Sequence, residues 1–110
     1  MIGWLNNNDN TLTSIYCSTA AATAAKVGQC TNYALLSKSY SIITMTAANS
    51  AQSALTLNVN SKGAKTIYIN GTVSSSTNYT LPAGQYLIYY DGTNYHFRTD
   101  GKIPGIALAA

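Results

Sequence analysis

The sequence has very little charge and no glutamate. Charged residues make up 8% of the 110 residues, whereas about 25% is usual for globular domains. Lysine, arginine and glutamine are scarce beside threonine, tyrosine and isoleucine, and this second group favours strands. Cytosolic monomeric enzymes usually carry far more charge. We therefore expect a β-rich protein that is secreted, displayed on a virion or cell surface, or largely buried in an assembly, with the last two favoured.

Residues that perform catalysis are equally scarce. General acid–base chemistry needs a carboxylate pair or a histidine with an orienting partner. The single histidine, His96, shares a strand face with Asn94 and Arg98, which is typical of a surface side chain. The three acidic residues lie in an arm, a turn and a strand exit, where aspartate usually serves the local backbone. We predict that the chain is not an enzyme. The three acidic residues, in the order arm, turn and strand exit, are Asp9, Asp91 and Asp100.

Two cysteines and one distant histidine do not form a zinc site, and no Asp-rich loop offers calcium ligands. We expect neither a metal nor another cofactor. A dyad of His96 with Cys17 or Cys30 is the remaining catalytic alternative, but nothing local marks either cysteine as activated. Without an export signal, two buried thiols are favoured over a disulfide between Cys17 and Cys30.

Nucleic-acid and membrane partners are not expected. The formal charge is +3, and the cations are scattered singly instead of forming a stripe that could follow phosphates. No apolar run approaches the length that spans a membrane. Met1-Ile-Gly-Trp-Leu5 is followed at once by an asparagine-rich run, without the basic and apolar regions of a signal peptide. We therefore expect synthesis and assembly in a cytoplasm.

The clearest strand patterns lie between Ala54 and Thr99. Leu55, Leu57 and Val59 alternate with polar residues, which predicts a strand with one buried face. Two runs of β-formers flank Asp91-Gly92, a dipeptide that supplies the positive φ angles of a tight hairpin. Further strands are expected at 11–18, 24–30, 39–47 and 65–69, with a brief pairing at Val73. We expect a loop or a single turn at 32–37, loops at 48–53 and 70–78, and a turn at 81–84.

These patterns predict one all-β domain, a small antiparallel β-sandwich or barrel-like sheet over residues 11–100. Short arms flank it at 1–10 and 101–110. Both arms are apolar, and tryptophan is favoured in contacts between proteins, although Trp4 could equally fold back onto its own domain. We predict that the arms dock on neighbouring subunits through Ile2, Trp4, Leu5, Ile103, Ile106 and Leu108.

Nine tyrosines accompany many asparagines and threonines. Exposed tyrosines can stack on sugar rings while amides bond sugar hydroxyls, so a sugar-binding face is one interpretation of this composition. The favoured interpretation is that tyrosine fills half-buried sheet positions, because it is a common strand residue. The candidate ligand residues are Tyr79, Tyr90, Asn94, Tyr95 and His96.

Several strings resemble a small β module of tailed-phage and prophage fibres and virion appendages. They are TAAKV at 23–27, LNVNSKGAKTIY at 57–68, LPAG at 81–84 and YDGTNY at 90–95, within a similarity over about residues 20–100. The resemblance implies a virion structural protein (a head fibre, a decoration protein or a tail-fibre component) that forms homo-oligomers, often trimers, and docks on other virion proteins. The alternative that it leaves open is a module that binds carbohydrate or a host receptor, such as a surface glycan.

Overall fold

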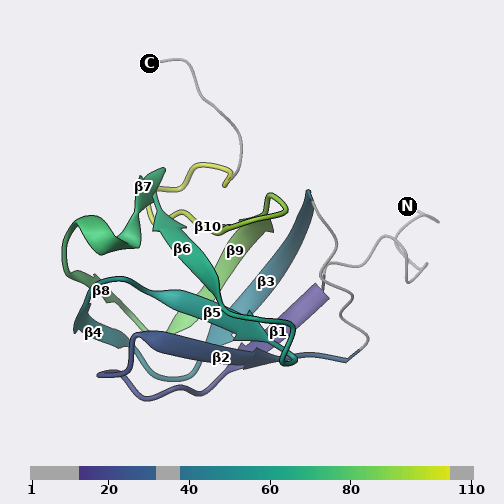
Figure 1. Cartoon of the computed structure of the whole chain (residues 1–110), viewed down its shortest axis with the longest axis horizontal. Helices are drawn as coiled ribbons and strands as arrows, with labels where there is room; N and C mark the ends of the chain where they lie inside the picture. The colour runs from purple at the N-terminus through teal and green to yellow at the C-terminus, as the bar shows by residue number, and fades with distance from the viewer. Residues whose placement is uncertain (1–12, 32–37, 105–110) are drawn as a thin grey trace.

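Seven strands close into a barrel in the computed structural model, which describes residues 13–31 and 38–104 (Figure 1). The strand order is β10-β9-β3-β1-β2-β5-β6, and pairing of β10 with β6 completes the barrel, while β7 extends the sheet beyond β6. A separate two-stranded sheet, β4–β8, lies at one side. The strands are β1 (Thr13–Cys17), β2 (Ala25–Gln29), β3 (Ser39–Met45), β4 (Asn49–Gln52), β5 (Thr56–Val59), β6 (Lys65–Ile69), β7 (Thr72–Val73), β8 (Tyr79–Leu81), β9 (Gly84–Tyr90) and β10 (Tyr95–Phe97).

The predicted all-β, barrel-like fold is confirmed, but antiparallel pairing throughout is wrong. Three neighbouring pairs run parallel, namely β1–β3, β2–β5 and β6–β10. The β1–β2 hairpin sits between β3 and β5, so its strands meet partners that come later in the chain. Closure gives each barrel strand two neighbours, which removes the open sheet edges that promote aggregation.

Alternating side chains from the barrel strands fill its interior. The predicted face of Leu55, Leu57 and Val59 is fully buried, as is Ile88 of β9. One chain therefore builds a complete apolar core, which is the main term that stabilises a domain of this size. The core comprises Ile15, Cys17, Ile43, Met45, Leu55, Leu57, Val59, Ile67, Ile69, Leu81, Ile88, Tyr90, Tyr95 and Phe97.

Strand β2 reverses the usual hydrophobic pattern. Lys26 and Gly28 face inward, and Lys26 is only 2% exposed, whereas Val27 between them faces solvent and is 53% exposed. A Cβ atom built on Gly28 would lie 2.6 Å from Cγ2 of Ile15, so any larger residue at this interior position would force the packed core to shift. The Lys26 ammonium donates to the carbonyl of Ala20 at 3.2 Å. Burial lowers the pKa of Lys26 below its ordinary 10.5, although the electrostatic interaction with Cys17 acts in the opposite direction and raises it.

The predicted loop at 48–53 is wrong, because Asn49–Gln52 forms β4 and pairs with β8. Asn49 is fully buried and its side chain donates to the carbonyl of Tyr79 at 2.8 Å, a long-range contact that no local pattern indicates. The predicted brief pairing at Val73 is confirmed, and its partner is Tyr68 of β6. Directly after it, Ser74–Ser76 forms the 3₁₀ helix η3 within the predicted loop.

The two cysteines are thiols, as expected. Cys17 is buried inside the barrel, while Cys30 is only half-buried.

Candidate functional site

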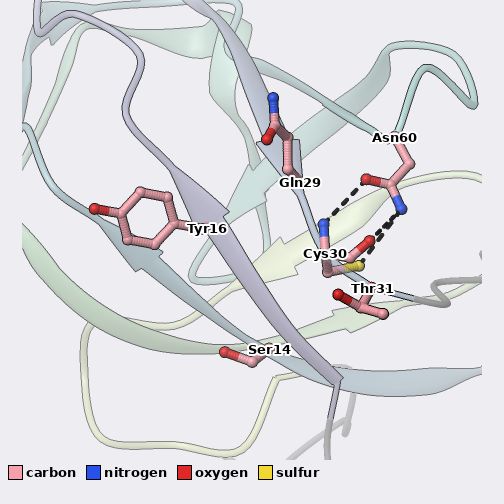
Figure 2. Close-up of a pocket in the computed structure, with 6 residues that line it drawn as sticks. All are labelled: Ser14, Tyr16, Gln29, Cys30, Thr31 and Asn60. Carbon is pink, nitrogen blue, oxygen red and sulfur yellow. Dashed lines mark hydrogen bonds between the residues drawn. The ribbon is translucent and has the colours of Figure 1, made fainter.

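An open hollow of about 490 Å³ lies on the outside of the β1–β2 hairpin. Its walls come from β1, from the end of β2 and from the turn that follows β5, so the barrel topology brings them together. Figure 2 shows the six described residues that line it, which are Ser14, Tyr16, Gln29, Cys30, Thr31 and Asn60.

Tyr16 gives the hollow its largest apolar surface. It alternates with Ile15 and Cys17 of the core, so its side chain faces outward and is 59% exposed. Gln29 is its direct partner across the β1–β2 ladder, and opposite residues of an antiparallel pair have neighbouring side chains. Ser14 lies two positions before Tyr16 and therefore on the same face. The hairpin thus sets a ring, an amide and a hydroxyl side by side.

Asn60 fixes the opposite wall. Its Oδ1 accepts a hydrogen bond from the backbone N–H of Cys30 at 3.0 Å, and its Nδ2 donates to the Cys30 carbonyl at 2.6 Å (Figure 2). Asn60 has φ of 52°, a left-handed conformation that asparagine tolerates better than most residues. The side chain therefore continues the β2–β5 pairing beyond the last residue of β5 and holds the end of β2 in place.

The described part of the lining contains hydroxyl, amide, thiol and phenol groups and no aspartate, glutamate, lysine, arginine or histidine. Such groups can donate and accept hydrogen bonds. They provide no charge to attract an ion and no strong acid–base pair. The described side chains therefore match an uncharged polar molecule better than an ion.

A second group of side chains forms a row on the outer face of the barrel, across β3, β9, β10 and β6. The ring centroids of Tyr40 and Tyr89 are 4.7 Å apart, those of Tyr89 and His96 are 6.3 Å apart, and those of His96 and Tyr68 are 5.2 Å apart. Each pair also lies directly opposite in the strand ladders. All four rings are half-buried, which matches the favoured interpretation of tyrosine as a sheet-filling residue.

Asp91 ties His96 to the predicted hairpin. Its Oδ2 lies 2.6 Å from Nε2 of His96, and its Oδ1 accepts hydrogen bonds from the backbone N–H groups of Thr93 and Asn94, both at 2.8 Å. Burial by itself raises the pKa of Asp91, but these hydrogen bonds and the attraction of His96 outweigh it and lower the pKa below 3.8. The geometry is that of a hairpin clamp, because every described partner of the carboxylate belongs to the same loop or to β10.

The predicted ligand residues do not form one surface. Tyr90 and Tyr95 are 6% and 1% exposed, and their ring centroids lie 5.0 Å apart in the core. The prediction that these two side chains belong to an exposed ligand-binding face is therefore wrong. Their inward direction follows from alternation with Leu87, Tyr89 and His96. Asn94 and His96 lie together on the β9–β10 hairpin, while Tyr79 lies on β8 in the separate sheet.

Of the predicted docking residues, Ile103 lies among the described residues and is 51% exposed. It precedes the buried Pro104, whose carbonyl accepts a hydrogen bond from the Tyr40 hydroxyl at 3.0 Å. This bond holds the chain after β10 against β3. The other predicted docking residues lie outside the described ranges and stay predictions: Ile2, Trp4, Leu5, Ile106 and Leu108.

Sequence reasoning missed the hollow. Alternation in β1 places Tyr16 outside, opposite the face of Ile15 and Cys17, and this signal was available. Nothing in the sequence indicates that Asn60 lies beside Cys30, because the two meet only through the parallel pairing of β2 with β5.

Within residues 13–31 and 38–104, no three or more histidine, cysteine or acidic side chains gather as a potential metal site. The same part of the chain contains no helix that is long and apolar enough to cross a membrane. Comparison of the chain with protein-family models, with curated proteins and with solved structures finds no match.

Proposed function

We propose that the chain is a non-enzymatic structural protein of a phage virion, in the class of head fibres, decoration proteins and tail-fibre components. It acts by forming a homo-oligomer, with a trimer favoured, and by docking on other virion proteins after synthesis in the host cytoplasm. The low charge and the fibre-like strings at 57–68 and 90–95 support this role. The observation that carries it is a set of apolar side chains left on the outside of a completed barrel.

We call this set the assembly face; it consists of Ile42, Leu87 and Ile103. Leu87 and Ile42 are direct partners in the β3–β9 ladder and point outward. Leu87 and Ile103 are exposed, and Ile42 is half-buried. Apolar side chains on the outer surface favour protein–protein contact, since burial stabilises by about 25 cal/mol per Å² of apolar surface.

Barrel closure directs this contact through side chains. Strands β3 and β9 each have two strand neighbours, so a partner cannot join the sheet there by adding a strand. A second copy would instead pack its own apolar side chains on the assembly face. Apolar termini that reach a neighbour would add to the same contact.

The non-enzymatic part of the proposal is supported by the use of the titratable side chains. Asp91 and His96 bind each other across the hairpin, and Cys17 lies in the barrel interior while His96 lies on its outer face. A Cys17–His96 dyad would need the cysteine to cross the sheet.

The mass of the full-length chain in solution tests the proposal. Light scattering after size exclusion should give three times the 11.6 kDa of one chain. Leu87→Lys and Ile103→Lys should lower this mass, because each places a charge in the contact. Val27→Lys, at a position on β2 that lies outside the assembly face and is about as exposed as Ile103, is the matched control and should keep this mass. A monomer at every concentration that also fails to bind purified virion proteins would contradict the proposal.

The arm prediction has its own test. A chain that lacks residues 1–10 should lose binding to virion proteins but keep the β-type circular dichroism spectrum of the full chain. Normal incorporation of the shortened chain into particles would show that the arm does not dock.

A further inference from the structure

We propose that the hollow beside Tyr16 binds a neutral oligosaccharide, with a sugar ring stacked on Tyr16 and sugar hydroxyls bonded to Ser14, Gln29 and Thr31. This inference does not depend on the proposed assembly role. It also uses residues other than the tyrosines and histidine of the β9–β10 hairpin. The juxtaposition of one exposed ring with uncharged polar groups in an open hollow carries it.

The ring provides the first contact. Tyr16 is 59% exposed on a strand that is paired on both sides, so a flat aromatic surface is held on a rigid support. The C–H groups on one face of a pyranose are apolar and can cover such a ring, while the phenol hydroxyl stays available at its edge. An exposed tyrosine of this kind has little conformational freedom to lose on binding.

The polar groups provide the second contact. The Gln29 amide and the Ser14 and Thr31 hydroxyls can each both donate and accept hydrogen bonds. Sugar hydroxyls have the same dual capacity, so the two sets match without requiring a fixed direction for each bond. Asn60 contributes to position, because both ends of its amide hold the backbone of Cys30.

Other ligand classes fit the hollow less well. An anionic ligand such as a nucleic acid or an acidic lipid would need cations, and the described lining has none. An apolar ligand would need aliphatic walls, and the six described lining residues include no leucine, isoleucine or valine. A peptide that adds a strand would need a free edge, but β1 lies between β3 and β2, and β2 lies between β1 and β5.

The hollow is preformed but open, so we expect weak binding to a single site. A few hydrogen bonds and one stacked ring are consistent with a dissociation constant on the order of 1 mM. An oligomer of the chain would present several hollows and bind a polymeric glycan more tightly through avidity.

Nuclear magnetic resonance titration of the full-length, ¹⁵N-labelled protein tests the site. The probes are cellohexaose, maltohexaose and the tetramer of N-acetylglucosamine, each raised to about 20 mM, well above the expected constant, together with an array of neutral glycans. At least one should bind, with amide shifts centred on Ser14, Tyr16, Gln29 and Thr31. Absence of binding to every probe, or shifts centred elsewhere, would overturn the proposal.

Two variants of the ring and one control make the assignment specific. Tyr16→Ala should weaken binding at least about fivefold, because it removes the stacking surface. Tyr16→Phe keeps the ring and should stay within about twofold of the parent, the loss expected from one exposed hydrogen bond. Val27→Ala, an exposed apolar position beside the hollow, should bind as the parent does. Unchanged binding by Tyr16→Ala, or an equal loss in Val27→Ala, would refute the site.

The same titration distinguishes sugar recognition from charge attraction. Dextran sulfate is the comparison ligand, because it carries sugar rings and many negative charges. Stronger binding of dextran sulfate than of every neutral probe would mean that the positive net charge attracts the polymer, and the neutral-sugar proposal would fail.

Discussion

Gly28 is the position where a small change should have the clearest effect on the barrel. It faces the interior from β2, and a Cβ atom there would lie 2.6 Å from Cγ2 of Ile15 and 3.5 Å from Leu57 Cδ1 and Val59 Cγ2. The first distance is far inside van der Waals contact. Ile15 is β-branched, so it cannot turn aside without leaving its preferred rotamer. We therefore expect Gly28→Ala to force a shift of the packed core.

Two opposing terms set the size of the effect. An extra methyl group in a filled core costs about 1–3 kcal/mol. Replacing glycine by alanine within a strand returns about 0.5–1 kcal/mol, because the unfolded chain loses freedom. The 2.6 Å approach places the cost in the upper half of its range, so the clash outweighs the return, and Gly28→Ala should lower the free energy of unfolding by about 1–2 kcal/mol. The midpoint of thermal unfolding should fall by roughly 4–16 °C.

Urea unfolding followed by circular dichroism measures this free energy, and a double-mutant cycle tests its cause. Ile15→Ala alone should cost about 2–5 kcal/mol by leaving a cavity. In that background Gly28→Ala should be neutral or stabilising, since its methyl group enters space that Ile15 vacated. Val27→Ala on the outer face of the same strand is the control. An unchanged or more stable Gly28→Ala protein, or the same cost in both backgrounds, would refute the packing argument.

Three further predictions concern polar side chains. Lys26→Met should be as stable as the parent at pH 7, or more stable, because it removes a buried charge. The parent, but not Lys26→Met, should gain stability as the pH rises from the lowered pKa of Lys26 towards 10.5, because the unfolded chain then binds more protons than the folded chain. Urea titrations across this pH range would measure both effects. Asp91→Asn should destabilise the protein at neutral pH by less than about 1 kcal/mol, because solvent screens the pair of this 34% exposed carboxylate with His96. The difference should vanish as pH falls from 3.8 through the lowered pKa of Asp91, as seen in thermal unfolding. Asn60→Ala should cost about 1–3 kcal/mol, because it removes both bonds to Cys30, whereas Asn60→Gly tests the same loss without strain from the positive φ.

An identical pH profile for Lys26→Met and the parent would mean that the buried ammonium is not penalised. A loss in Asp91→Asn that persists below the lowered pKa of Asp91 would indicate a role other than its charge. Full stability of both Asn60 variants would show that the end of β2 is held by other contacts.

Local patterns determined a large part of this protein. Alternation at Leu55, Leu57 and Val59 identified a core face correctly, because a strand places every second side chain on the same side. Asp91-Gly92 identified the hairpin, because its conformation depends on only a few consecutive residues. The prediction of an all-β, barrel-like domain followed from the same strand and turn signals.

Only the tertiary structure decided which strands became neighbours and which way β2 faces. Hydrophobicity would turn Val27 inward, but pairing with β1 and β5 sends Lys26 and Gly28 into the barrel instead. At Gly28 the interior is already filled by Ile15, Leu57 and Val59 of the adjoining strands. The space left at this position, and not the hydrophobicity of β2, therefore decides which residue fits. The hollow beside Tyr16 arises in the same way, because its walls come from segments that meet only when the barrel closes.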